Sequence, residues 1–196
     1  MVDAARLESI LEDLAGDAGL RSAVGDWVRW LRDERRSSSH TVDAYVRDLS
    51  GFLTFMAGHL GSPLTINGLE TLAVRDFRAW LAHRSSIGLE RNSTARALSV
   101  VRGVFVWLER NDLARNHAIR AVRTPKQPHS VPKPLDEAEA MAVIRDVGIL
   151  AGEPWIAARD IAIMTLLYGC GLRISEALRL TRSQAPFGST LRVIGK

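Results

Sequence analysis

The sequence predicts a mainly α-helical protein in two parts joined by a proline-rich linker. Before residue 124, apolar residues recur at intervals of three and four positions, which is the period of a helix with one buried face. Four of the 7 prolines fall in residues 124–134, where proline removes backbone donors and disfavours helix in the residue before it. After the linker the helical period returns, and a short strand-like segment follows. We therefore expect a helical bundle over residues 21–123 and a second part over residues 135–196.

Four helices are predicted before the linker, each from one apolar stripe. The stripes are Val24, Trp27, Val28 and Leu31; Val42, Tyr45, Val46, Leu49, Phe52, Leu53 and Met56; Val74, Phe77, Trp80 and Leu81; and Ala97, Leu98, Val101, Phe105 and Leu108. Thr41 is the expected N-cap of the second helix, and Ser93 or Thr94 that of the fourth. Amphipathic helices with short connections favour a compact bundle with the aromatic side chains in its core.

The second part is predicted to begin with a capped helix. Asp136 can cap this helix, and Glu139 stands three residues later, as in a capping box. The elements expected after it are a mostly buried helix through residues 155–168, a short helix over residues 175–180 and a strand over residues 190–194.

Composition excludes several classes of protein. The chain has 196 residues, 46% of them hydrophobic, which is enough for one or two domains with substantial cores. No apolar run reaches the roughly 20 residues that cross a bilayer, and the N-terminus lacks the pattern of a signal peptide. The single cysteine, Cys170, fits a reducing cytoplasm, and between two glycines we expect it to be buried rather than reactive. The expectation is a cytoplasmic protein with no membrane association.

The net charge of +4 is unevenly distributed along the chain. Residues 1–20 form an acidic leader with one arginine and five acidic residues, whereas residues 21–125 hold sixteen arginines and ten acidic residues. Arginine suits bidentate contacts with phosphate and guanine. The arginine surplus therefore favours a nucleic-acid partner, and a set of solvated helix faces is the alternative interpretation.

One segment of the second part places an arginine at the start of a helix. Glycines on both sides of Cys170 break the chain, and Arg173 stands where the next helix is expected to begin. An arginine beside exposed backbone N–H groups suits an anionic oxygen such as that of a phosphate. An ordinary surface arginine after a helix C-cap is the alternative.

Two motifs of the second part resemble active-site segments of the tyrosine recombinases. Residues 168–178, Tyr-Gly-Cys-Gly-Leu-Arg-Ile-Ser-Glu-Ala-Leu, are similar to the segment that carries the first active-site arginine, in the variant of the bacterial Xer type. Residues 191–196, Leu-Arg-Val-Ile-Gly-Lys, resemble the strand and turn that carry the catalytic lysine. Arg173 and Lys196 stand 23 residues apart, which is close to the usual separation in the family.

Two helices of the first part resemble the core-binding domain of the same family. The matching segments are residues 39–49 and residues 94–102. The resemblance implies an N-terminal four-helix core-binding bundle of the SAM-like type, a linker, and then the start of a mixed α/β catalytic domain over residues 135–196.

The resemblance also implies site residues and partners. It implies catalytic roles for Arg173 and Lys196, and DNA contacts for Arg47, Arg96 and Arg102. The implied reaction is attack by a tyrosine on a DNA phosphodiester through a 3′-phosphotyrosyl intermediate, with arginines on the non-bridging oxygens and the lysine as general acid. It needs no metal and no cofactor. The implied partners are double-stranded DNA and a partner recombinase in a heterotetramer, in chromosome dimer resolution at cell division.

The remaining residues of the family site, an H-x-x-R motif, a second histidine or tryptophan, and the tyrosine, lie after the lysine in the family. His117 and Arg120 spell H-x-x-R, but in the wrong order and the wrong part of the chain. Tyr45 and Tyr168 belong to apolar helices and are poor candidates for the nucleophile. We therefore expect a C-terminally truncated chain that docks on DNA and is inactive alone.

Two interpretations outside the recombinases stay open. A non-catalytic DNA-binding or accessory protein could use the same helices, and a helical scaffold could form without any DNA role. A binding module has no need for both Arg173 and Lys196, so the two motifs favour a recombinase. Phage integrases and transposon recombinases are the alternatives within the family.

Overall fold

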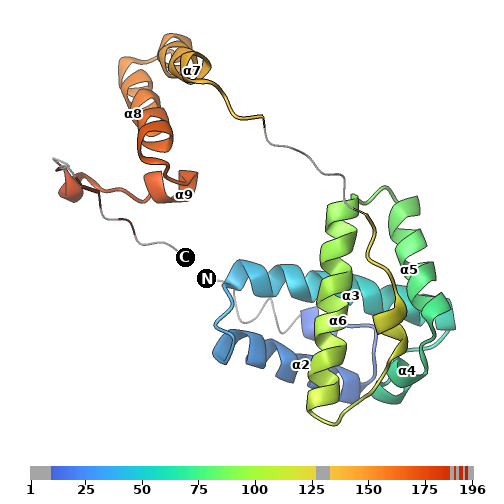
Figure 1. The fold of residues 1–196 in the computed structure, drawn as a ribbon. Coiled ribbons are helices and arrows are strands. Elements are labelled where there is room, and N and C mark those ends of the chain that lie inside the picture. Colours follow the sequence, from blue (N-terminus) through green and yellow to red (C-terminus); the bar gives the residue numbers. More distant parts are fainter. Residues whose placement is uncertain (1–9, 127–132, 186–187, 189, 192, 194–196) are drawn as a thin grey trace. The chain divides into compact units, whose positions relative to one another are not determined.

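The structure is a computed structural model, and it describes residues 10–126, 133–185, 188, 190, 191 and 193. The chain divides into two compact units, residues 1–129 and residues 130–196, which we call the N-terminal and C-terminal units. Helices are the regular elements of both units (Figure 1), which confirms the mainly α prediction. The strand expected over residues 190–194 lies partly outside the described residues, and positions 190, 191 and 193 are irregular.

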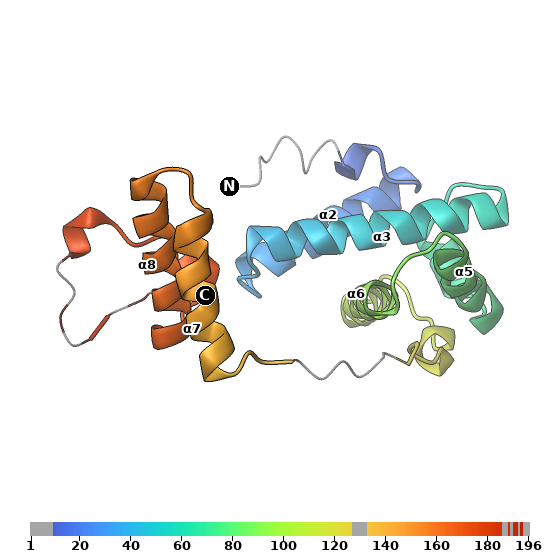
Figure 2. The same cartoon turned by 90° about the horizontal axis from the view of Figure 1, so that it is seen from above.

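Four helices of the N-terminal unit follow the predicted apolar stripes, and a fifth, a short helix over residues 66–71, was not predicted. They are α2 (Ala18–Asp33), α3 (Ser39–Leu60), the short α4 (Ile66–Thr71), α5 (Val74–Ser86) and α6 (Arg91–Arg110), followed by the 3-10 turn η1 (Ala118–Ala121). α6 crosses α3 steeply (Figures 1 and 2), and α2 and α5 each contact both of these helices.

The predicted caps of two helices are wrong by a few residues. Ser38, not Thr41, is the N-cap of α3, and its hydroxyl accepts a hydrogen bond from the Thr41 backbone N–H at 3.3 Å. α6 begins at Arg91, ahead of both Ser93 and Thr94. The hydroxyl of Thr94 and the carbonyl of Ser93 instead accept long hydrogen bonds from the guanidinium of Arg84, so tertiary contacts occupy these two residues.

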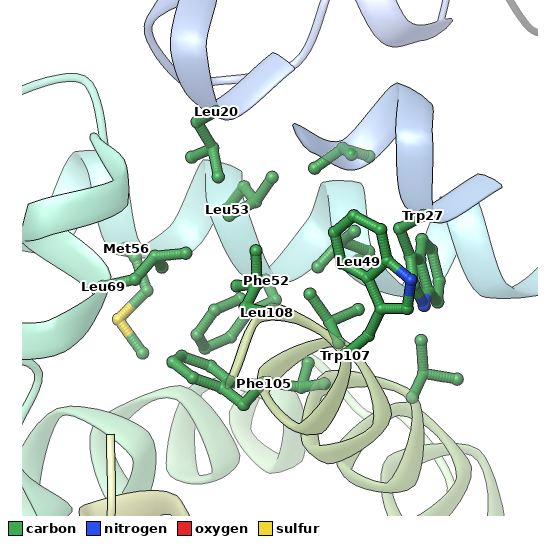
Figure 3. Packing of buried hydrophobic residues seen from close by; sticks show 14 of the residues in the cluster. Leu20, Trp27, Leu49, Phe52, Leu53, Met56, Leu69, Phe105, Trp107 and Leu108 are labelled. Atoms are coloured by element: carbon green, nitrogen blue, oxygen red, sulfur yellow. The ribbon is translucent and has the colours of Figure 1, made fainter. Parts of the chain in front are cut away.

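An aromatic cluster forms the centre of the N-terminal unit, as the stripes predicted. The ring of Phe52 on α3 lies 5.9 Å from Phe77, 5.0 Å from Trp80 and 6.5 Å from Phe105, measured between ring centroids. The contacts to Trp80 and Phe105 are edge-to-face, which suits the quadrupoles of aromatic rings. Figure 3 shows Phe52 and Phe105 facing each other between α3 and α6. This cluster ties α3, α5 and α6 together.

A buried asparagine fixes the segment that follows α6. The side-chain amide of Asn116 donates hydrogen bonds to the backbone carbonyls of Leu69 at 2.7 Å and Leu72 at 2.8 Å. Its carbonyl oxygen accepts one from the backbone N–H of Ala118. The chain is thereby held against α4 before it turns towards the linker.

The C-terminal unit consists of a helical hairpin and two short turns of helix. Its elements are α7 (Glu137–Leu150), α8 (Pro154–Cys170), α9 (Ile174–Ala177) and the 3-10 turn η2 (Arg182–Gln184). The predicted capping box at α7 is confirmed, because Asp136 accepts from the Glu139 N–H at 2.8 Å and Glu139 accepts from the Asp136 N–H at 2.9 Å.

The expectation of a mostly buried α8 is wrong. Trp155 is 63% exposed and Tyr168 is 51% exposed, and Cys170 is exposed as well. The apolar residues of α8 are not confined to one stripe, and α7 and α9 cover only part of the helix. The helix also continues through Gly169 and ends at Cys170, and the C-cap residue Gly171 is in the left-handed region with φ of 62°.

One carboxylate stabilises the start of α5. Ala73 at the N-cap has no side-chain acceptor, and Asp76 accepts a hydrogen bond from its backbone N–H at 2.8 Å. Asp76 also lies 3.2 Å from Nε2 of His59 on α3. Burial alone would raise the pKa of Asp76, but these hydrogen bonds and the charge of Arg75 lower it.

The Asp76→Asn substitution should lower the free energy of unfolding by about 1 kcal/mol at neutral pH, because the cap of α5 is weakened. A lowered pKa in the folded state stabilises the protein above the ordinary aspartate pKa of about 3.9, and this stabilisation is lost as the pH falls through the folded value. The difference in the free energy of unfolding between the variant and the unchanged protein should therefore disappear at pH values below the folded-state pKa of Asp76. Urea unfolding across pH measures it.

The control for this prediction is Asp33→Asn, which removes an exposed carboxylate that forms no ion pair within the described parts of the chain. Its unfolding free energy should keep the pH dependence of the unchanged protein. A stability loss in Asp76→Asn that persisted undiminished in acid would contradict the role of the carboxylate.

Candidate nucleic-acid interface

A groove lined by arginines lies between α6, α2 and α3. Its volume is about 620 Å³. The lining residues are Trp27, Trp30, Leu31 and Arg35 from α2 and the turn after it, Tyr45 from α3, and Arg96, Ser99, Val100, Arg102, Gly103, Val106, Trp107 and Arg110 from α6. Four of these residues are arginines, and none of the residues found to line the groove is acidic. A positive groove with aromatic walls suits the phosphates and bases of nucleic acid.

Arg96 is held in the groove by a buried carboxylate on α3. Its Nε lies 2.9 Å from Oδ2 of Asp48, and its Nη2 lies 3.4 Å from Oδ1. The Asp48 side chain is 7% exposed and that of Arg96 is 51% exposed. The hydrogen bond and the negative charge of Asp48 raise the pKa of Arg96.

A second arginine lies within reach of the same charge. Arg84 is buried, with its guanidinium 5.4 Å from the ring centroid of Trp80. Burial lowers the pKa of Arg84, whereas the charge of Asp48 acts in the opposite direction. One buried carboxylate therefore acts on two guanidinium groups.

Arg102 binds the segment through which the chain leaves the N-terminal unit. Its Nη1 donates to the hydroxyl of Thr124 at 2.9 Å, and its Nη2 donates to the carbonyl of Val122. These bonds tie the segment before the linker to α6. They leave part of the guanidinium on the groove wall.

Arg47 lies away from the other two predicted DNA contacts. It is exposed on α3 and lines a separate hollow of about 210 Å³ with Ile10, Asp43 and Ser50. The structure therefore brings Arg96 and Arg102 to one groove and places Arg47 on another surface.

Two groove arginines were missed by the sequence analysis. Arg110 could have been found, because it continues the exposed face of α6 from Arg96 at helical spacing. Arg35 lies in the turn after α2, where there is no helical period from which the direction of its side chain could be predicted. Its guanidinium lies 5.5 Å from the ring centroid of Trp30, so stacking on an indole places it at the groove.

In the C-terminal unit, Arg173 is the N-cap of α9, as the sequence predicted. Its backbone N–H donates to Oε2 of Glu176 at 2.9 Å, and its Nη1 donates to Oε1 at 3.0 Å. The backbone hydrogen bond and the guanidinium lower the pKa of Glu176. The Arg173 side chain is 77% exposed, and the second predicted catalytic residue, Lys196, lies outside the described residues.

Among the described residues, no group of three or more histidine, cysteine, aspartate or glutamate side chains is arranged to hold a metal ion. Among the helices that the structure describes, none combines the length and apolar character needed to cross a membrane.

Comparison with known proteins identifies relatives of this chain. Residues 24–112 match the family model described as "Phage integrase, N-terminal SAM-like domain". Tyrosine recombinase XerC of Rhodospirillum centenum is 44% identical over 175 residues, which cover 89% of this chain and 51% of that protein. Tyrosine recombinase XerC of Rhizobium meliloti is 48% identical over 173 residues, which cover 87% of this chain and 54% of that protein. The integrase from mycobacterium phage Brujita aligns with a TM-score of 0.48 at 20% identity over 82% of this chain and 49% of that one.

These matches support the assignment of the chain to the tyrosine recombinases, and the relatives that it matches are of the Xer type. The predicted SAM-like bundle is confirmed for the N-terminal unit. The chain spans about half the length of these relatives. The mixed α/β character expected of the second part is not visible in the residues that the structure covers there.

The Arg102→Ala substitution should release the segment at residues 122–124 from α6. We expect amide hydrogen exchange in this segment to become about 5- to 10-fold faster, because the two hydrogen bonds from a charged donor are lost. Arg110→Ala removes a groove arginine that makes no hydrogen bond to this segment in the described structure, and should leave the exchange unchanged. Equal exchange rates in the two variants would contradict the proposal that Arg102 holds residues 122–124 against α6.

Proposed function

We propose that this chain is part of a site-specific recombinase of the Xer type, which cuts and rejoins DNA through a 3′-phosphotyrosyl intermediate. The observation that carries the proposal is the identity of 44% and 48% with two XerC proteins along nearly the whole chain. Because the chain spans about half of those proteins, the activity is proposed for the protein that contains the complete family site. The corresponding biological role is chromosome dimer resolution at cell division, in the cytoplasm.

The N-terminal unit supplies the contacts with double-stranded DNA in this proposal. The groove is lined by four arginines, and a guanidinium group with a free edge can make forked contacts with phosphate oxygens. Arg96 and Arg102 contact DNA from this groove, and Arg47 does so from the exposed side of α3. Binding through phosphates is sequence-independent and depends strongly on salt.

The C-terminal unit supplies part of the chemistry. The attack of a tyrosine on the phosphodiester builds negative charge on the non-bridging oxygens, and Arg173 stabilises that charge. Its exposure at the start of α9 leaves the guanidinium accessible to a DNA strand. Lys196 donates a proton to the departing 5′ oxygen. Arg173 and Lys196 do not include the tyrosine nucleophile or the remaining residues of the family site, so this chain alone binds DNA without cleaving it. In the complete protein, a partner recombinase joins it in a heterotetramer.

Arg110→Ala should weaken binding of the chain to a double-stranded oligonucleotide by about 3- to 10-fold, because one phosphate contact is lost. The matched control is Arg78→Ala, which removes an exposed arginine from α5 outside the groove. Fluorescence anisotropy at several salt concentrations measures both. Equal losses in the two variants would show that net charge matters and the groove does not.

Arg173→Ala, in a protein that joins this chain to the rest of the family site, should reduce the rate at which the covalent DNA–protein complex forms by about 10²- to 10³-fold. Binding of the same DNA should stay within about twofold, since the groove is unchanged. Gel analysis of a nicked duplex measures the covalent complex. Arg179→Ala, which changes a nearby exposed arginine, is the control, and a complex that survived in Arg173→Ala would refute the catalytic role.

A further inference from the structure

The pairing of Arg96 with Asp48 leaves one side of the guanidinium unused. A guanidinium group carries five N–H donors in a planar fork. Asp48 accepts from Nε at 2.9 Å and from Nη2 at 3.4 Å, and so occupies one edge. The edge formed by Nη1 and the second N–H of Nη2 has no partner among the residues the structure describes. Arg96 lines the groove, and about half of its side chain is exposed.

The charges around this pair still favour an anion. Asp48 alone would neutralise Arg96 and make it a poor phosphate ligand. The buried guanidinium of Arg84 adds a second positive charge that acts on the same carboxylate. The three side chains together carry a net charge of +1, and the exposed member of the cluster is the one in the groove. The net positive charge of Asp48, Arg84 and Arg96 therefore acts on the groove through the exposed side chain of Arg96.

We propose that Asp48 is a positioning residue for DNA binding: its buried carboxylate holds Arg96 so that the free N–H edge meets a phosphate of the DNA backbone. This inference rests on the proposed function. An unrestrained arginine loses rotamer freedom when it binds, whereas Arg96 has already been ordered by Asp48. The carboxylate thus increases the affinity for a polyanion although it carries the same sign of charge.

The sign of this effect separates the proposal from simple electrostatics. Asp48→Asn raises the net charge by one, and counterion release alone predicts tighter binding. Positioning predicts weaker binding, by about 3- to 10-fold, and a salt dependence reduced by about one phosphate contact. Asp43→Asn makes the same charge change on the same helix and removes a carboxylate that forms no ion pair in the described chain. It should leave binding unchanged or tighten it.

The test measures binding of the full 196-residue chain to a labelled duplex of mixed sequence by fluorescence anisotropy across a salt series. The variants are Asp48→Asn, Asp43→Asn, Arg96→Lys and the Asp48→Asn/Arg96→Lys double variant, each checked by thermal unfolding. Lysine keeps the charge at position 96 but has no fork, so Arg96→Lys should bind about as weakly as Asp48→Asn. The double variant should bind no more weakly than Arg96→Lys, because both changes remove one contact.

The outcomes separate this inference from the proposed function. If the unchanged chain does not bind the duplex, the proposed function is overturned, and the role of Asp48 with it. If the unchanged chain binds and Asp48→Asn binds equally well or better, the positioning role alone is overturned. Should Asp48→Asn fail to fold, Arg96→Lys decides, since it alters an exposed side chain: binding equal to that of the unchanged chain would overturn the proposal.

Discussion

Burial of one face of α6 against α3 is the constraint on which the N-terminal unit depends. Half of the residues of α6 are buried, and Phe105 among them packs on Phe52. Because a helix has a fixed period, burying this face decides which residues point outward. Arg96 and Arg110 are two of them, on the same outward face as Gly103. The position of the groove arginines thus follows from the packing of the core. A change of register in α6 would disrupt both the core and the groove.

The core of the N-terminal unit could be predicted from the sequence because it follows from periodicity alone. The caps could not, since Ser38, Ser39, Thr41, Ser93 and Thr94 are all chemically suitable. Contacts far apart in the sequence decide among such residues, as Arg84 does at the start of α6. The pairing of Arg96 with Asp48 escaped prediction for the same reason, because the partners stand 48 residues apart.

In the C-terminal unit, local chemistry was predicted better than packing. The capping box of Asp136 and Glu139 and the place of Arg173 at a helix start depend on neighbouring residues, and the structure has both. The burial of α8 depends on how much surface its neighbours provide, which its own apolar sequence does not specify. The catalytic role of Arg173 follows only from the resemblance to a family motif and stays a prediction; the relatives support the family itself.

The exposure of Cys170 has a practical consequence. It is the single cysteine of the chain, and it ends α8 just before the left-handed Gly171. A thiol-reactive fluorophore or spin label would therefore attach at one defined point, three positions from Arg173, without any engineered residue. Such a reporter would sense any ligand that approaches this segment, by a change in its mobility or emission.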